Sequence, residues 1–136
     1  MYFLVATGFP SGQFPLQTRL DEMKYAIENR ASEIDIVLDR SLVLRHDWQT
    51  LYEEIRQMRY ICGKTVHMKA ILSIGELGSF TNIYKASLIA MMAGSDFIKT
   101  STGICSIFSF FNLIDQANYD FNSNYLPVKV LLLEYL

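Results

Sequence analysis

The chain has 136 residues, 51% of them hydrophobic and 13% aromatic, which is enough for one domain with a hydrophobic core. Its 12 basic and 14 acidic residues are mixed along the chain and give a net charge of −2. This balance excludes the basic surface typical of proteins that bind nucleic acids or anionic membranes. No apolar run approaches the roughly 18 residues needed to span a bilayer, and Gly8 and Pro10 interrupt the only stretch where a signal peptide would lie. Cys62 and Cys105 form no CxxC pair, which favours a reducing, cytoplasmic compartment.

Short apolar runs rich in strand-forming residues alternate with amphipathic segments along most of the chain. Strands are expected at residues 2–7, 33–38, 66–72 and 96–100. Strict alternation of strands and helices predicts an α/β protein with a parallel sheet built from right-handed βαβ units. A doubly wound sheet and a TIM barrel both fit this pattern, and the pattern alone does not separate them.

Three helices are expected between these strands, from the helical spacing of apolar residues. The first is expected to begin at Thr18, which has the residue type of an N-cap. The second is expected to begin after Asp47 and to end at Gly63. The third is expected to begin after Thr81 or Asn82 and to end at the following glycine, Gly94.

Three charged residues, Asp35, Lys69 and Lys99, fall in the middle of expected strands. Strands of a parallel sheet are usually apolar because both faces are covered. A charge buried without a partner is costly, so such groups are paired, neutralised or used in chemistry. The alternation of side chains along each strand allows all three to point into one cavity.

Two interpretations of these three residues remain open. In the first, they form an active site, since a deprotonated lysine amine attacks carbonyl carbons, and a low dielectric and a second cation lower a lysine's pKa. A carboxylate across the cavity could then move protons, directly or through water. In the second, the three residues form a structural ion pair inside a sheet or barrel.

The sequence also resembles a known family, the deoxyribose-phosphate aldolases, and in particular the longer eukaryotic type. The likeness runs from Val5 to Gly103 and is carried by four segments: VATGFPSG, EIDIVL, MKAILSIGELG and AGSDFIKTSTG. It implies a partial TIM (β/α)₈ barrel of about four strands at residues 1–103, because a complete barrel needs about 250 residues. Residues 104–136 do not resemble the family and are expected to form a divergent, irregular C-terminal extension.

The resemblance also implies an activity, that of a class I aldolase, a carbon–carbon lyase. This is the reversible cleavage of 2-deoxy-D-ribose 5-phosphate to acetaldehyde and D-glyceraldehyde 3-phosphate through a lysine Schiff base. By the match of FIKTSTG, Lys99 would be the imine-forming lysine; by the match of EIDIVL, Asp35 would be the proton relay. Lys69 would be an electrostatic helper. The implied partner is a small phosphorylated sugar, with no cofactor, nucleic acid or membrane, and the sequence sets no oligomeric state.

Some features of the family are missing from this sequence. It contains neither the KPAGG-type motif that carries a second catalytic lysine nor the glycine-rich phosphate-binding turn, and Ile74 replaces a hydroxyl-bearing residue. These departures predict a truncated form with weak or no activity. The alternative is a non-catalytic truncated isoform or pseudo-enzyme that acts by binding partners. His46 and His67 lack metal-ligand partners at usable spacing, so no metal is expected.

Overall fold

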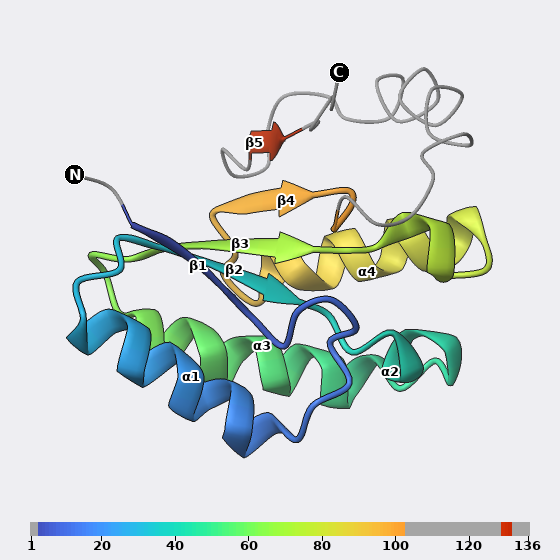
Figure 1. Ribbon diagram of the computed structural model, residues 1–136. Coiled ribbons are helices and arrows are strands. Elements are labelled where there is room, and N and C mark those ends of the chain that lie inside the picture. The colour runs from blue at the N-terminus through green and yellow to red at the C-terminus, as the bar shows by residue number, and fades with distance from the viewer. Residues whose placement is uncertain (1–2, 103–128, 132–136) are drawn as a thin grey trace.

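A computed structural model describes residues 3–102 and, for the backbone alone, residues 129–131. Its strands form one parallel sheet in the order β1-β2-β3-β4-β5 (Figure 1). These strands are β1 (Leu4–Thr7), β2 (Glu33–Val37), β3 (His67–Ile71), β4 (Phe97–Lys99) and β5 (Lys129–Leu131). The predicted parallel sheet is confirmed. β5 was not predicted; the rest of the expected irregular extension lies outside the described residues.

Within residues 3–102, four α-helices and one 3₁₀ helix connect the strands. They are α1 (Leu16–Glu28), α2 (Arg40–Leu44), α3 (Trp48–Cys62), η1 (Ile74–Glu76) and α4 (Phe80–Met92). Figure 1 shows α1, α3 and α4 on one side of the sheet. In the part of the chain that the structure describes, no helix is long and apolar enough to cross a membrane.

Some of the predicted helix boundaries are confirmed. The Asp47 carboxylate accepts a hydrogen bond from the Thr50 amide at 3.2 Å and caps α3. Gly63 ends the same helix in a backbone conformation with φ of 60°, which glycine adopts without strain. The short helix α2 was not predicted, because five residues are too few to show a helical period.

Two predicted helix starts are wrong by a few residues. α1 begins directly after Pro15, so Thr18 lies inside the helix; the fixed φ of proline suits a helix start without any side-chain cap. α4 begins after Ser79, whose hydroxyl oxygen accepts a hydrogen bond from the Asn82 backbone amide at 3.2 Å. Ser79 is therefore the N-cap, and neither Thr81 nor Asn82 is.

The sheet has one apolar face and one charged face. Residues paired in parallel strands share a face, and the face covered by the helices carries fully or almost fully buried apolar side chains: Ile34, Ile36, Met68, Ala70 and Ile98. These side chains pack with the helices into one core. The residues between them in sequence, including Asp35, Lys69 and Lys99, therefore project from the opposite face. The predicted facing of the three charged residues is confirmed.

The loop after β1 is held against the end of β2. Gly12 has φ of +71°, and a Cβ atom at this position would lie 2.0 Å from the Leu38 carbonyl oxygen. Only glycine allows so close an approach. The loop therefore lies beside the carboxyl end of β2, at the edge of the sheet where parallel α/β proteins build their sites.

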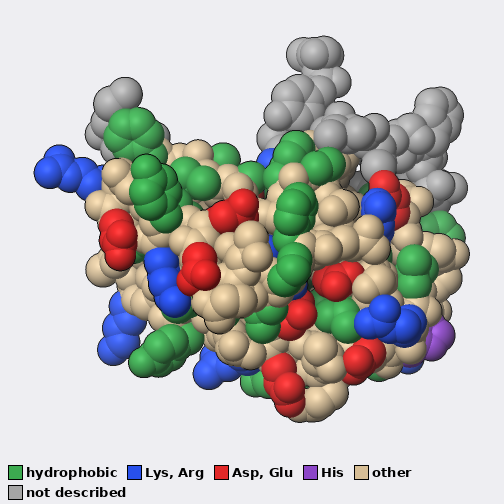
Figure 2. Space-filling model, turned by 60° about the horizontal axis from the view of Figure 1, so that its bottom comes forward, with side chains coloured by type: hydrophobic (Ala, Val, Ile, Leu, Met, Phe, Trp, Pro, Cys, Tyr) green, Lys and Arg blue, Asp and Glu red, His purple; other side chains and the backbone are tan. Residues whose placement is uncertain are grey.

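Figure 2 shows acidic and basic side chains interspersed on the face that it presents. No large patch of a single sign of charge is seen on this face. The mixed pattern agrees with the charge distribution of the sequence.

Cys62, on the buried side of α3, gives a prediction about stability. Burial raises the pKa of its thiol from 9.0 to about 11, Asp96 adds to the rise and Arg59 opposes it. The folded state therefore binds this proton more tightly than the unfolded state, so the stabilisation is complete below pH 9 and is lost as the pH rises toward 11. Between pH 8 and pH 10, the free energy of unfolding should fall by about 1.3 kcal/mol more in the wild type than in Cys62→Ala. Urea unfolding of both proteins measures the difference; a difference that does not change with pH would contradict the prediction.

Candidate active site

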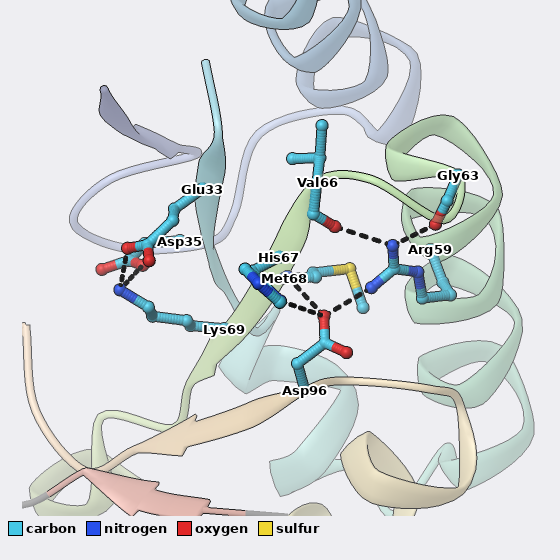
Figure 3. Close-up of polar contacts among 9 residues, drawn as sticks. All are labelled: Glu33, Asp35, Arg59, Gly63, Val66, His67, Met68, Lys69 and Asp96. Atoms are coloured by element: carbon cyan, nitrogen blue, oxygen red, sulfur yellow. Dashed lines mark hydrogen bonds and ion pairs between the residues drawn. The ribbon is translucent and has the colours of Figure 1, made fainter. Parts of the chain in front are cut away.

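The three predicted site residues meet on the charged face of the sheet. Lys99 Nζ on β4 donates a hydrogen bond to Asp35 Oδ2 on β2 at 3.1 Å. Lys69 Nζ on β3 lies 3.9 Å from the other oxygen of the same carboxylate. Lys69 also donates to Glu33 Oε2 at 2.5 Å, and Figure 3 shows its ammonium between the two carboxylates of β2. The four side chains form one cluster, which we call the lysine–carboxylate cluster.

The strand register explains this arrangement. Asp35 is the register partner of Lys69, so these residues are neighbours in one row across the sheet. Lys99 is the register partner of Ile71, one row nearer the carboxyl ends of the strands. Its side chain reaches Asp35 diagonally across β3. Two lysines from different rows therefore converge on one carboxylate.

The cluster is largely shielded from solvent. Asp35 is only 1% exposed and Lys69 is 9% exposed, while the side chain of Lys99 retains 16% exposure. The ring of Phe97 lies 5.8 Å from Lys69 Nζ and covers it with a cation–π contact. Charge interactions in so dry a site are stronger than in water, and each group depends on its partners for compensation.

Glu33 was not among the predicted site residues. The sequence pattern predicts it only as the start of a strand, although the same alternation that selects Asp35 places Glu33 on the same face two residues earlier. With Glu33 included, the cluster contains two acidic and two basic side chains. If Lys99 becomes a neutral amine, the Lys69 ammonium still has both carboxylates as partners.

Asp35 Oδ1 is buried and has no hydrogen-bond partner among the described residues. The Lys69 ammonium at 3.9 Å is beyond hydrogen-bond distance. One oxygen of this carboxylate is therefore held by Lys99, and the other can accept a proton or a hydrogen bond from a bound molecule. A carboxylate in this state is suited to general base chemistry.

A separate group of polar contacts ties the amino ends of the strands together (Figure 3). Asp96 Oδ2, just before β4, accepts hydrogen bonds from Arg59 Nη1 on α3 at 2.7 Å and from the Met68 amide on β3 at 2.8 Å. The exposed His67 lies 3.8 Å from the same oxygen. This group fixes the position of β4 beside β3 at the end away from the loops after the strands.

The two histidines are not part of the lysine–carboxylate cluster. His46 stacks on the ring of Trp48, and His67 lies edge-on to Phe97. Within residues 3–102, no group of three or more His, Cys, Asp or Glu side chains is arranged to hold a metal ion.

These features define a segment of a parallel α/β barrel with paired lysines and a carboxylate on the face opposite its helices. Comparison with known proteins names the family. Residues 7–125 match the model of the DeoC/LacD family aldolases, and the chain belongs to this family. The match runs past residue 103, and the boundary between a family-like part and a divergent tail stays a prediction.

Curated relatives show the same relationship at higher identity. The chain is 64% identical over 99 residues to the human deoxyribose-phosphate aldolase. These residues make up 73% of this chain and 31% of the human protein. It is 41% identical over 96 residues to the deoxyribose-phosphate aldolase of Agrobacterium fabrum, covering 71% of this chain and 37% of that protein. The chain thus spans about a third of the length of these relatives.

Solved structures support the predicted partial TIM barrel, which is confirmed. An aldolase called QR15 matches with a TM-score of 0.77 and 27% identity, covering 88% of this chain and 54% of that one. The deoxyribose phosphate aldolase from Aeropyrum pernix matches with a TM-score of 0.68 and 28% identity, covering 78% of this chain and 44% of that one.

The geometry of the cluster predicts a large stability loss when its central carboxylate is neutralised. Asp35→Asn leaves two poorly solvated lysines with only Glu33 to compensate them, so the free energy of unfolding should fall by about 3 kcal/mol. Asp21→Asn is the matched control, because Asp21 pairs with Lys24 at 3.4 Å with side chains 59% and 50% exposed. This control should lose no more than about 0.5 kcal/mol. Urea unfolding measures both, and equal losses would show that the Asp35 cluster is hydrated.

Proposed function

We propose that this chain carries out imine-based aldol chemistry on 2-deoxy-D-ribose 5-phosphate, releasing acetaldehyde and D-glyceraldehyde 3-phosphate reversibly. The observation that carries this proposal is the contact of the poorly exposed Lys99 ammonium with the buried Asp35 carboxylate. The substrate comes from the names of the curated relatives. Because the chain spans only about a third of their length, the activity of the whole relatives is a proposal for this chain.

Lys99 is the nucleophile in the proposed first step. Its ammonium gives up a proton to Asp35 or to water, and the free amine adds to the C1 aldehyde carbon of the open-chain sugar. The resulting carbinolamine loses water and becomes an iminium ion bonded to Nζ. The positive iminium then provides the electron sink for the next step.

Asp35 is the proton relay in the bond-breaking step. Its carboxylate takes the proton of the C3 hydroxyl, and the electrons of the C2–C3 bond move into the iminium to give an enamine. D-glyceraldehyde 3-phosphate leaves with the new C3 carbonyl. The proton held by Asp35 then returns to C2 of the enamine, and water hydrolyses the iminium to release acetaldehyde and the Lys99 amine. Oδ1, which lacks a partner among the described residues, is the oxygen available for this transfer.

Lys69 acts as an electrostatic helper in this proposal. Its ammonium is held by Glu33 and lies beside Asp35 throughout. A fixed cation at this position keeps the Asp35 carboxylate oriented, with its other oxygen held by Lys99. The steps use no metal or organic cofactor. The buried free thiol of Cys62 is compatible with the cytoplasm as the site of the reaction.

A second candidate is a non-catalytic role, in which the same four charges form only a structural ion-pair network. The observation that favours it is the pairing of Lys69 with Glu33 and of Lys99 with Asp35, which compensates every charge in the cluster. Binding to partners would then be the function of the chain. The two candidates differ in whether Lys99 reacts with an aldehyde.

Reductive trapping tests the proposal. The chain is incubated with acetaldehyde and cyanoborohydride, and the modified lysines are identified by peptide mass mapping. Lys99 is expected to be modified fastest, although it is much less exposed than Lys24. Lys99→Arg keeps the positive charge but cannot form an imine, and should abolish the fast modification and the cleavage of the sugar phosphate. Lys85→Arg, on the exposed side of α4, is the matched control and should change neither.

The two candidates give opposite orders of labelling. A structural ion-pair network predicts that Lys99 is modified more slowly than the exposed lysines, because burial alone slows the reaction. Slow labelling at Lys99 together with no cleavage of the sugar phosphate would overturn the proposed function. Asp35→Asn should lower the cleavage rate by about 100-fold or more, the usual contribution of a positioned proton-transfer group.

A further inference from the structure

Ser73 has an unusual backbone conformation. It lies two residues beyond Ile71, the last residue of β3. Its φ of 52° and ψ of 55° lie in the left-handed region, which is unfavourable for residues other than glycine. Arg30 and His46 are the other described non-glycine residues with positive φ, and both lie in exposed turns. Ser73 is only 4% exposed. Strain at a buried position persists only where the surrounding structure enforces it.

The strain arises from an extra residue in the segment directly after β3, relative to the segment directly after β4. The Leu72 amide donates to the Lys99 carbonyl at 2.9 Å, and the Ile74 amide donates to the Thr100 carbonyl at 3.0 Å. Two residues along the first chain thus match one residue along the second, which is the pattern of a β-bulge. Ser73 is the bulged residue and lies opposite the peptide that joins Lys99 to Thr100. A bulge next to a site redirects the side chain that it carries.

The hydroxyl of Ser73 is also unsatisfied. Its Oγ atom is buried and has no hydrogen-bond partner among the described residues. A buried hydroxyl without a partner is unfavourable, and so is the left-handed backbone. Glycine at this position would avoid both costs. Two unfavourable features at one residue beside the proposed nucleophile point to a function in binding.

We propose that Ser73 determines the specificity of the aldol reaction by hydrogen bonding to a hydroxyl group of the acceptor aldehyde. This inference rests on the proposed function, since it assumes an imine at Lys99. Substrates reach such a site from the carboxyl ends of the strands, so the part of the substrate farthest from the imine points toward the loops. Ser73 lies on that side, two residues beyond Ile71, the register partner of Lys99.

The order of groups along the substrate suits a hydroxylated acceptor. In the proposed mechanism, the C3 hydroxyl gives its proton to Asp35, whose register partner Lys69 lies two rows of side chains before Ser73. The next hydroxyl away from the imine is the one at C4, beside the carbonyl of the hydroxy aldehyde that leaves. The part of the substrate beyond C3 extends toward the loops, where Ser73 lies. Ser73 would therefore favour acceptor aldehydes that carry a hydroxyl close to the carbonyl.

The test uses the reaction in the direction of synthesis, with acetaldehyde as donor and two acceptors. One acceptor is glyceraldehyde 3-phosphate, and the other is propanal, which has no hydroxyl. Ser73→Gly removes the hydroxyl and relieves the strained backbone, so its melting temperature should be equal to or above that of the wild type. Its kcat/KM for glyceraldehyde 3-phosphate should fall about 10-fold, with kcat/KM for propanal unchanged. Ser73→Ala keeps the strained backbone, so it should show the same loss of discrimination with a melting temperature below that of Ser73→Gly.

Ser95→Ala is the matched control. Ser95 is also 4% exposed with an unpartnered hydroxyl, but it lies before β4, at the opposite end of the sheet. This variant should keep the wild-type ratio between the two acceptors. If Ser73→Gly lowers kcat/KM equally for both acceptors, or for neither, the proposal about Ser73 is overturned. The proposed function still stands in that case if Lys99 is trapped as an imine. If no adduct forms at Lys99 in the wild type, both the proposed function and this inference are overturned.

Discussion

The arrangement of the sheet depends on one buried carboxylate, that of Asp35. A charge with 1% exposure in a parallel sheet requires compensation, and Asp35 receives it from lysines on two different strands. This requirement fixes the side on which β2, β3 and β4 carry their charges, because a shift of one residue in any of them would turn Asp35 or one of the two lysines toward the apolar core. The apolar side chains between the charged ones then face the helices. One interaction thus links the register of three strands, the core and the candidate site.

The pairing of β3 with β4 differs between the two ends of the sheet. At the amino end, Asp96 bonds to the Met68 amide and to Arg59, which fixes β4 beside β3 and α3. At the carboxyl end, the bulge at Ser73 breaks the regular pattern beside Lys99. In parallel α/β barrels, the amino ends of the strands contribute to stability and the carboxyl ends form the binding site. The strained Ser73 lies at the end where a substrate would enter.

Membership of the DeoC/LacD aldolase family gives this geometry a chemical meaning. Both lysines, their shared carboxylate and Glu33 come from three consecutive strands within the matched residues. A lysine held against a carboxylate in a poorly solvated site is suited to imine chemistry.

The sequence by itself determined the order of strands and helices, the facing of Asp35, Lys69 and Lys99, and the caps at Asp47 and Gly63. These features follow from short-range rules, since side chains alternate along a strand and capping residues act on neighbouring amides. Only the tertiary structure revealed the Glu33–Lys69 pair, the bulge at Ser73, the short helix α2 and the strand β5. Apart from α2, which is too short to show a helical period, each of these depends on which strand lies beside which and in what register. A left-handed serine and a second carboxylate partner are set by contacts between residues far apart in sequence, and local patterns do not encode such contacts.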